Sequence, residues 1–282
     1  MSDLIVILLN AATLTSILML VGLGLAIIFG LMRVLNLAHG EFVAIGAFAM
    51  VVAHDAGLGF VGGLVLATAV GALGGLLLEW GIVRHLYHRP IQAILATWGV
   101  SLAFQQLLQL AFGTGARTVP APIQGAVEIM GTAYPAYRLL LIALSLLLFA
   151  ALAIAMRRTS LGLDLRAVIQ NREMAESVGI NTARTFSISF AIGSAVAAIA
   201  GALVAPLVSI LPQIGVNYLA NSFFVVIVGG VGSMGGVLAG SAFIGGLDSL
   251  IAYQLSPSLS RAIVLLLAII LVRFRPQGLV KP

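Results

Sequence analysis

The chain lacks cysteine altogether, and it holds few charged residues of any kind. The absence of cysteine excludes disulfide bonds and metal sites built from thiolates. Asp, Glu, Lys and Arg make up only 8% of the residues, whereas soluble domains carry about 25%. So few charges cannot cover a soluble fold with solvated side chains, and the sequence therefore excludes that class of protein.

Lysine occurs only once, as Lys281. A phosphate-binding loop of the form GxxxxGK[ST] needs a lysine that reaches the phosphates. The Gly-rich stretch GGVGSMGG at 229–236 is followed by no such residue, so the sequence contains no P-loop. If ATP drives this protein, another polypeptide must hydrolyse it.

Long apolar runs fill most of the chain, which is 61% hydrophobic. Several exceed 20 residues, enough to cross a hydrocarbon core of about 30 Å. Only helices and closed barrels satisfy their backbone groups in lipid, and LLLIALSLLLFAALAIAM at 139–156 does not alternate as barrel strands do. The sequence predicts an all-α, polytopic transmembrane bundle, with residues 1–282 forming a single transmembrane domain.

Hydropathy predicts about nine spans, or eight to ten if Gly-rich segments are re-entrant. The beginning MSDLIVILL lacks the basic region of a cleavable signal peptide, so the first run is expected to remain as a span. With the N-terminus outside and the C-terminus in the cytoplasm, eleven basic residues fall inside and three outside, as the positive-inside rule requires. This topology, rather than nucleic-acid binding, explains the net charge of +5. The predicted spans are 4–31, 41–56, 59–83, 93–112, 138–156, 185–208, 218–232, 236–253 and 260–273. The inside residues are Arg33, Arg84, Arg89, Arg157, Arg158, Arg166, Arg172, Arg184, Arg273, Arg275 and Lys281, and the outside residues are Arg117, Arg138 and Arg261.

One polar segment interrupts this pattern. Residues 157–184, hereafter the polar segment, hold eight of the chain's 23 charged side chains. Placing eight charges in lipid at about 3 kcal/mol each would cost roughly 20 kcal/mol, so the segment is expected in the cytoplasm. The apolar residues Leu165, Val168, Ile169, Ala175 and Val178 recur at near-helical spacing.

The polar segment is therefore predicted to form one or two short amphipathic helices. Asp164 is the expected N-cap, Arg172 and Glu176 form an i,i+4 pair, and Gly179 is the expected C-cap. Such a helix could lie on lipid headgroups or dock into a groove of a partner protein. Interfacial helices have bulkier apolar faces and Lys/Arg-rich polar faces, so the mixture of Arg and Glu favours a partner protein.

Four passages of the sequence resemble one family of transporters. They are GLMRVLNLAHGEFVAIGAF at 30–48, LATWGVSLAFQQ at 95–106, RAVIQNREMAESVGIN at 166–181, and VVIVGGVGSMGGVLAGSAFIGG at 225–246, followed by RFRPQGL. Together they resemble the ABC importer permeases of the branched-chain amino acid and urea/amide group. The resemblance covers essentially the whole chain and implies location in the bacterial inner membrane.

The resemblance also implies partners. They are a second, homologous permease, two cytoplasmic ATPases that carry ATP and Mg²⁺, and a periplasmic solute-binding protein. The chain itself then performs no covalent chemistry, is not an enzyme, and binds no cofactor or metal. The ATPase contact is expected within the polar segment, at Arg166, Gln170, Asn171, Arg172, Glu173, Glu176 and Gly179.

Two groups of polar residues are candidates for the solute pathway. NLAHGE at 36–41 places Asn36, His39 and Glu41 between two spans, and Thr97, Ser101 and Gln105 form an i+4 stripe on one helix face. One interpretation is that NLAHGE breaks a helix and that both groups of polar side chains line a water-filled pathway. They can equally cap helices or bond neighbouring helices together, and the sequence leaves both interpretations open.

Small and acidic residues complete the set of candidates. Gly232, Gly236 and Gly240 repeat at i+4, a pattern that favours close helix packing. Asp248 is the ionisable residue set deepest in an apolar run, and Glu41 and Glu79 lie near span ends. These three acids would be the coupling residues if the protein were instead a self-sufficient secondary transporter or channel.

The solute is predicted to be a hydrophobic, branched-chain amino acid. ATWGVSLAFQQ and RAVIQNREMA look closer to urea and short-amide permeases, whereas the chain lacks the long N-terminal extension of many urea permeases. Urea or a short amide therefore stays an alternative.

Overall fold

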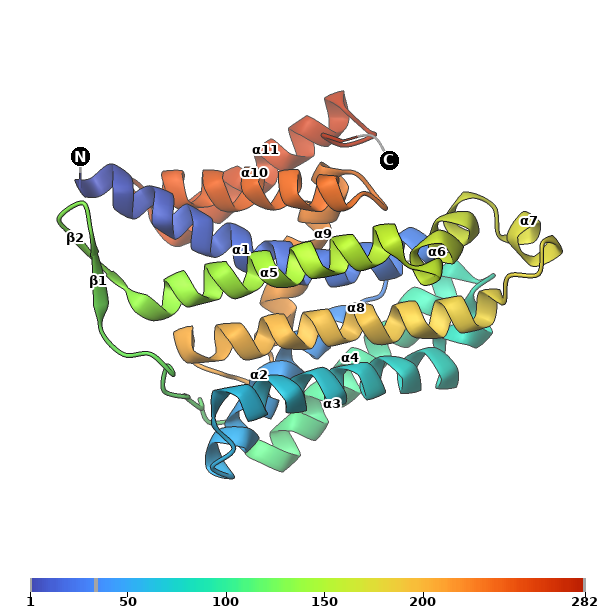
Figure 1. Ribbon diagram of the computed structural model, residues 1–282, viewed down its shortest axis with the longest axis horizontal. Helices are drawn as coiled ribbons and strands as arrows, with labels where there is room; N and C mark the ends of the chain where they lie inside the picture. Colours follow the sequence, from blue (N-terminus) through green and yellow to red (C-terminus); the bar gives the residue numbers. More distant parts are fainter. Residues whose placement is uncertain (1, 33–34, 281–282) are drawn as a thin grey trace.

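The computed structural model describes residues 2–32 and 35–280, which form a helical bundle with one small hairpin (Figure 1). Arg33 and Lys281, two of the expected cytoplasmic charges, lie outside the described residues. The α-helices are α1 (Ser2–Met32), α2 (His39–Asp55), α3 (Gly59–Gly81), α4 (Pro90–Phe112), α5 (Ala136–Arg158), α6 (Ser160–Gln170), α7 (Arg172–Ser177), α8 (Thr182–Val204), α9 (Ile214–Gly229), α10 (Met234–Ala252) and α11 (Pro257–Phe274). Two 3-10 helices, η1 (Val83–Leu86) and η2 (Ala205–Leu207), and two antiparallel strands, β1 (Ala126–Ile129) and β2 (Thr132–Pro135), complete the elements.

The bundle has two distinct ends (Figure 1). One carries the β1–β2 hairpin and the N-terminus and is called the hairpin end. The other carries α6 and α7 and is called the polar-segment end. The long helices run between the two ends, and the C-terminus lies toward the polar-segment end. The termini therefore lie toward opposite ends of the bundle, as an odd number of passes requires.

Every predicted span coincides with a helix, which confirms the all-α, polytopic class. Among the described residues, seven helices are long and apolar enough to cross a membrane. The other two, α2 and α9, have only 17 and 16 residues. At 1.5 Å per residue α9 spans about 24 Å, less than a hydrocarbon core of about 30 Å. The count of nine complete spans thus stays a prediction.

Both short helices begin inside the bundle. The His39 side chain at the start of α2 contacts the carbonyl oxygen of Val21 on α1, and His39 is fully buried. Gly40 packs directly against Gly215 in the first turn of α9, so the two helix N-termini meet. A Cβ at either glycine would overlap the other's backbone. Interrupted helices of this kind are typical of transporters, whose solute sites lie beside them.

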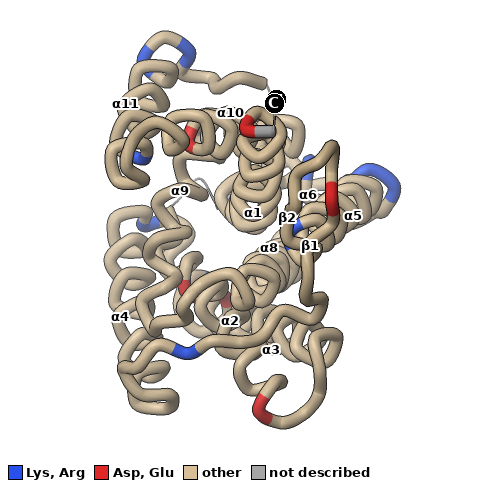
Figure 2. The backbone as a smooth tube through the Cα atoms, turned by 90° about the vertical axis from the view of Figure 1, so that its left-hand side faces the viewer, with Lys and Arg blue, Asp and Glu red and all other residues tan. Residues whose placement is uncertain are grey.

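The neighbours of α1, α2 and α3 correspond to those of α8, α9 and α10. α1 packs against α9 and α10. In the same way, α8 packs against α2 and α3. The corresponding helices also contact each other: α1 contacts α8, and α2 contacts α9. Viewed from the hairpin end, α1 and α8 lie near the middle of the bundle (Figure 2). The sequence shows no such repeat, so the correspondence appears only in the packing.

Candidate functional site

The polar segment folds as two short helices joined at Asn171. Thr159, rather than Asp164, caps α6, because its hydroxyl accepts a hydrogen bond from the backbone NH of Gly162 at 3.4 Å. The prediction for Asp164 was wrong, since the last turn of α5 ends at Arg158 and α6 begins four residues before Asp164. The Asn171 side chain caps α7 by accepting from the NH of Met174 at 3.0 Å. Gly179 follows α7 with φ of 90°, as expected of a C-terminal glycine.

The apolar face of the polar segment packs on the chain's own bundle. Leu165, Val168 and Ala175 are buried in one cluster with Ile27 and Leu31 of α1, together with Met156 and Phe186. The apolar side is therefore occupied neither by lipid nor by another protein. What remains for a partner is the outer surface of α6 and α7.

Arg172 of α7 packs against Tyr87 and against Phe186 of α8. Its guanidinium lies 5.7 Å from the ring centre of Tyr87 and 5.3 Å from that of Phe186 on α8. The same group donates to Glu176 at 3.0 Å, which confirms the predicted i,i+4 pair. The Thr182 hydroxyl also donates to Glu176 at 2.6 Å. The hydrogen bond from Thr182, and after it the one from Arg172, holds the pKa of the Glu176 carboxyl below its ordinary value.

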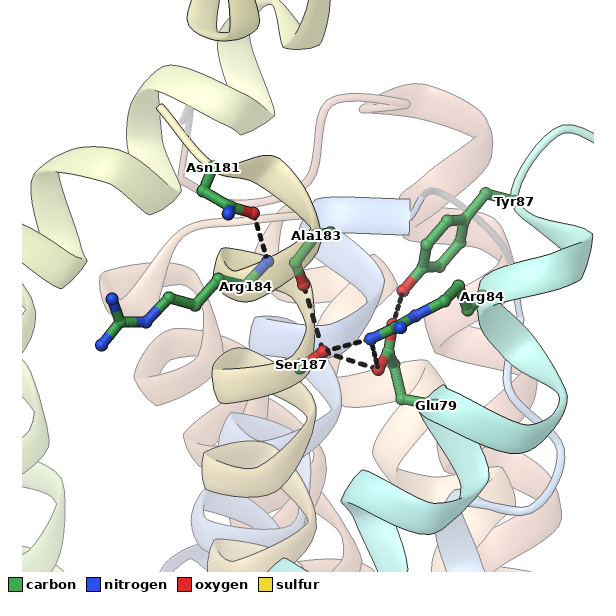
Figure 3. A network of polar contacts seen from close by, with 7 residues as sticks. All are labelled: Glu79, Arg84, Tyr87, Asn181, Ala183, Arg184 and Ser187. Atoms are coloured by element: carbon green, nitrogen blue, oxygen red, sulfur yellow. Dashed lines mark hydrogen bonds and ion pairs between the residues drawn. The ribbon is translucent and has the colours of Figure 1, made fainter. Parts of the chain in front are cut away.

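Tyr87 continues this connection to a buried carboxylate (Figure 3). Glu79, at the end of α3, is fully buried and accepts hydrogen bonds from Tyr87 at 2.5 Å and from Ser187 of α8 at 2.7 Å. Arg84 forms an ion pair with it at 3.3 Å and donates to Ser187 at 3.0 Å. Burial and the Glu79 carboxylate together raise the pKa of the Tyr87 phenol. The polar segment is thus linked through Arg172, Tyr87 and Glu79 to both α3 and α8.

The predicted ATPase-contact residues divide into two groups. Five support the segment itself: Arg166 donates to the Met156 carbonyl at 3.0 Å, and Asn171, Arg172, Glu176 and Gly179 act as described above. Gln170 and Glu173 are exposed on the outer surface.

The outer surface also carries two apolar residues: Met174, which the sequence analysis did not select, and Val178, which it had placed on the apolar face. Met174 is 62% exposed and Val178 is 71% exposed, and both line a shallow groove between α6 and α7 together with Gln170 and Asn171. The prediction that Val178 shares the apolar face with Leu165 and Ala175 was wrong, because α7 ends at Ser177 and the Val178 side chain is exposed.

The two groups of pathway candidates lie against each other. Ser101 and Gln105 of α4 both donate to Oε1 of Glu41 on α2, at 2.7 and 2.9 Å. The Thr97 hydroxyl accepts from the NH of Leu37 at 3.1 Å. The stripe therefore joins α4 to the start of α2, the packing alternative that the sequence left open.

The polar groups at the start of α2 are only partly paired. Asn36 Oδ1 accepts from the NH of Ala38 at 3.0 Å, and His39 Nε2 donates to Val21 at 3.2 Å. Within the described part of the chain, Asn36 Nδ2, His39 Nδ1 and Glu41 Oε2 make no hydrogen bond. Buried polar atoms are normally paired, so unpaired ones fit a region that is hydrated in another conformation. The pathway role of this group and of the stripe stays a prediction.

The three glycines of the small-residue pattern do not share one role. Gly236 and Gly240 of α10 lie against the backbones of Gly229 and Val225 on α9, where a Cβ would overlap a carbonyl oxygen or carbon. Gly232 lies outside the helix, in the turn before α10, with φ of 80° and open space around its Cβ position. Its predicted place in a helix-packing stripe is therefore wrong, and the turn explains the glycine.

Among residues 2–32 and 35–280, no three His, Cys, Asp or Glu side chains gather closely enough to hold a metal ion. The groups with unusual geometry are instead the linked polar segment and the interrupted helices.

Known proteins resemble the chain over almost its whole length. The branched-chain amino acid permease LivH of Escherichia coli K12 is 28% identical, over 96% of this chain and 93% of its own. The corresponding permease BraD of Pseudomonas aeruginosa is 23% identical over 96% and 94%. The permease LivM of Escherichia coli K12 is 26% identical, over 96% of this chain and 69% of its own. No solved structure matches.

The family described as the permease component of the branched-chain amino acid transport system matches residues 7–272. That match includes the interrupted helices, the polar segment and the Glu79 cluster. The chain therefore belongs to the family of branched-chain amino acid transport permeases.

Proposed function

We propose that the chain is one permease subunit of an ATP-driven importer of branched-chain amino acids in the bacterial inner membrane. The relatives named above are permeases for branched-chain amino acids, which favours these solutes over urea. The similarity to LivM as well as LivH supports a second, homologous permease as partner. Two ATPases and a solute-binding protein complete the proposed complex.

The observation that carries the mechanism is the link from the polar segment to α3 and α8. Arg172 lies over Tyr87 and Phe186, and Tyr87 bonds to Glu79 at the end of α3. A force applied to α7 would reach both transmembrane helices through these contacts. ATPase closure beneath α7 would then tilt α3 and α8 and change which end of the pathway is open.

This assignment places the polar-segment end in the cytoplasm and the hairpin end outside. The outer groove of α6 and α7, with Gln170, Glu173, Met174 and Val178, would receive the ATPase. The absence of a GK[ST] motif agrees with ATP hydrolysis on a separate subunit.

The test uses two exposed methionines at opposite ends of the bundle. Met174 on α7 is 62% exposed and Met130 in the hairpin turn is 86% exposed. In the assembled transporter, Met174→Asp should lower co-purification of the ATPases and ATPase stimulation, because a charge enters an apolar contact. Met130→Asp should leave both unchanged. Unchanged ATPase binding in Met174→Asp and in Glu173→Arg would place the contact elsewhere.

A second measurement separates this function from a self-sufficient transporter. Leucine uptake into proteoliposomes should require the second permease, the ATPases, ATP and the binding protein. Uptake by the chain alone, driven by an ion gradient, would refute the proposed function.

A further inference from the structure

A cavity opens toward the hairpin end among α1, α9, α10, α11 and residues 208–209. Its volume is about 230 Å³, below the range of roughly 300–1,000 Å³ for drug-sized ligands, so it suits a small solute. The four helices lie side by side when the molecule is viewed from the hairpin end (Figure 2). The cavity also borders the first turns of the interrupted helix α9, where Ile214 and Asn217 line it.

Two opposite charges face this cavity from neighbouring helices. Asp248 lies near the end of α10 and Arg261 near the start of α11, and both line the cavity. Among the described residues, the ion pairs within 4.0 Å are Arg84–Glu79 and Arg172–Glu176. Asp248 and Arg261 are therefore paired neither with each other nor with another charged side chain of the described chain.

The Asp248 carboxylate is nevertheless held in place. Ser260, which is fully buried, donates to its Oδ1 at 2.5 Å. Asn217 and Asn221, one turn apart on α9, add two amide groups to the same cavity. Amides donate and accept hydrogen bonds equally well. The polar part of the cavity thus offers a negative group, a positive group and neutral groups together.

Apart from Ser209 and Tyr218, the rest of the wall is aliphatic. Leu14 and Leu18 of α1, Ile244 of α10 and Val264 of α11 line the cavity, and the last three are almost completely buried. Aliphatic surface of this kind favours a hydrophobic group on the ligand. One ligand class carries an ammonium, a carboxylate and an aliphatic group within a few bonds.

We infer that this cavity is a solute site for zwitterionic aliphatic amino acids, with Arg261 facing the carboxylate and Asp248 facing the ammonium. The planar guanidinium suits a carboxylate, with which it forms strong paired hydrogen bonds. Urea carries no charge and would leave both side chains unneutralised. The inference rests on the proposed function and names the residues that recognise its solute.

The test compares charge-removing variants in the complete transporter, reconstituted in proteoliposomes with saturating leucine-loaded binding protein. Arg261→Gln and Asp248→Asn should each lower leucine uptake about tenfold or more, because each loses a charge-assisted contact with the solute. ATPase stimulation by the binding protein should stay unchanged. Arg261→Lys and Asp248→Glu should restore part of the uptake. Arg273→Gln, at the other end of α11, is the matched control and should transport normally.

A labelling experiment tests the solute class directly. In the otherwise cysteine-free transporter, Asn217→Cys should react with a small anionic thiol reagent, and leucine at high concentration should slow the reaction at least about twofold whereas urea should not. Val216→Cys is the control, because Val216 is 47% exposed but does not line the cavity. Equal protection by urea would overturn the zwitterion assignment.

The outcomes separate this inference from the proposed function. If the unmutated transporter takes up no leucine, the proposed function fails. If it takes up leucine and Arg261→Gln and Asp248→Asn do so equally well, only the solute site is overturned. If both variants lose ATPase stimulation by the binding protein, these charges belong to a docking surface for that protein, and the solute site is again overturned.

Discussion

Glu79 shows how the neighbouring side chains decide the role of a single residue. By sequence it is an acid near the end of a span, a candidate coupling residue for a self-sufficient transporter. In the structure its carboxylate is fully buried but compensated by Arg84, Tyr87 and Ser187. A buried charge with such partners supports local structure. Its position between α3 and α8 instead makes it part of the link to α7.

Two helix glycines, Gly46 and Gly99, are predicted to differ in how far substitution by alanine changes the stability of the bundle. Gly46 on α2 lies so close to α8 that a Cβ would overlap the carbonyl oxygen of Ala198, whereas Gly99 on α4 has open space there. Gly46→Ala should therefore destabilise the bundle by at least about 1–3 kcal/mol, the usual cost of overpacking. Gly99→Ala should be neutral or stabilising, because alanine favours helix by about 1 kcal/mol.

Thermal unfolding of the purified protein in detergent, followed by loss of the monodisperse fraction, measures both variants. An equal effect of the two substitutions would show that α2 and α8 do not approach as closely as described.

At the scale of elements, α4 depends on very few buried residues for its place in the bundle. Only Ala93, Thr97, Ser101 and Leu108 are buried among its described residues, and two of them contact the start of α2 through hydrogen bonds. The opposite face exposes large apolar side chains, including Leu102 and Leu110. That face meets lipid or another subunit in the membrane.

Ser101 tests whether the polar stripe mainly joins helices. Ser101→Leu should release α4 from α2, because Ser101 is only 5% exposed and leaves no room for a larger side chain. The expected result is loss of assembled transporter on size-exclusion chromatography. Ser101→Ala should be mild, since hydrogen bonds between membrane helices average about 0.6 kcal/mol. Leu102→Ser, at an exposed neighbouring position, is the control. Intact assembly with blocked uptake in Ser101→Leu would instead assign the stripe to the pathway.

At the scale of the whole molecule, the two ends of the bundle predict which loops share a side of the membrane. Four exposed residues lie in segments that belong to the two ends. Ser160 begins α6 and Gln277 follows α11, whereas Thr118 lies between α4 and β1 and Ser256 between α10 and α11. By the ends of these helices in Figure 1, the first two segments belong to the polar-segment end and the last two to the hairpin end. Single cysteines at Thr118 and Ser256 should react with a membrane-impermeant thiol reagent added to intact cells. Those at Ser160 and Gln277 should react only after the cells are opened. Labelling of Gln277→Cys in intact cells would reverse the orientation of the C-terminal helices.

The sequence by itself determined the class of protein, the positions of the helices and the existence of a polar segment. These properties depend on local composition, because hydropathy, helical spacing and capping involve residues close together in the chain. The family was also evident from four motifs that lie in order along the chain. The Arg172–Glu176 pair and the role of Gly179 followed in the same way, since each involves neighbours within one turn.

Only the tertiary structure decided where the functional features come together. Gly40 and Gly215 lie on different helices, as do Arg172 and Phe186, and no periodicity within one helix specifies which faces meet. A broken helix at NLAHGE was one interpretation of the sequence, but the start of α9 inside the bundle was hidden, because residues 218–232 were predicted as a span of their own. Packing between distant segments, rather than composition, therefore places the cavity and connects the polar segment to the bundle.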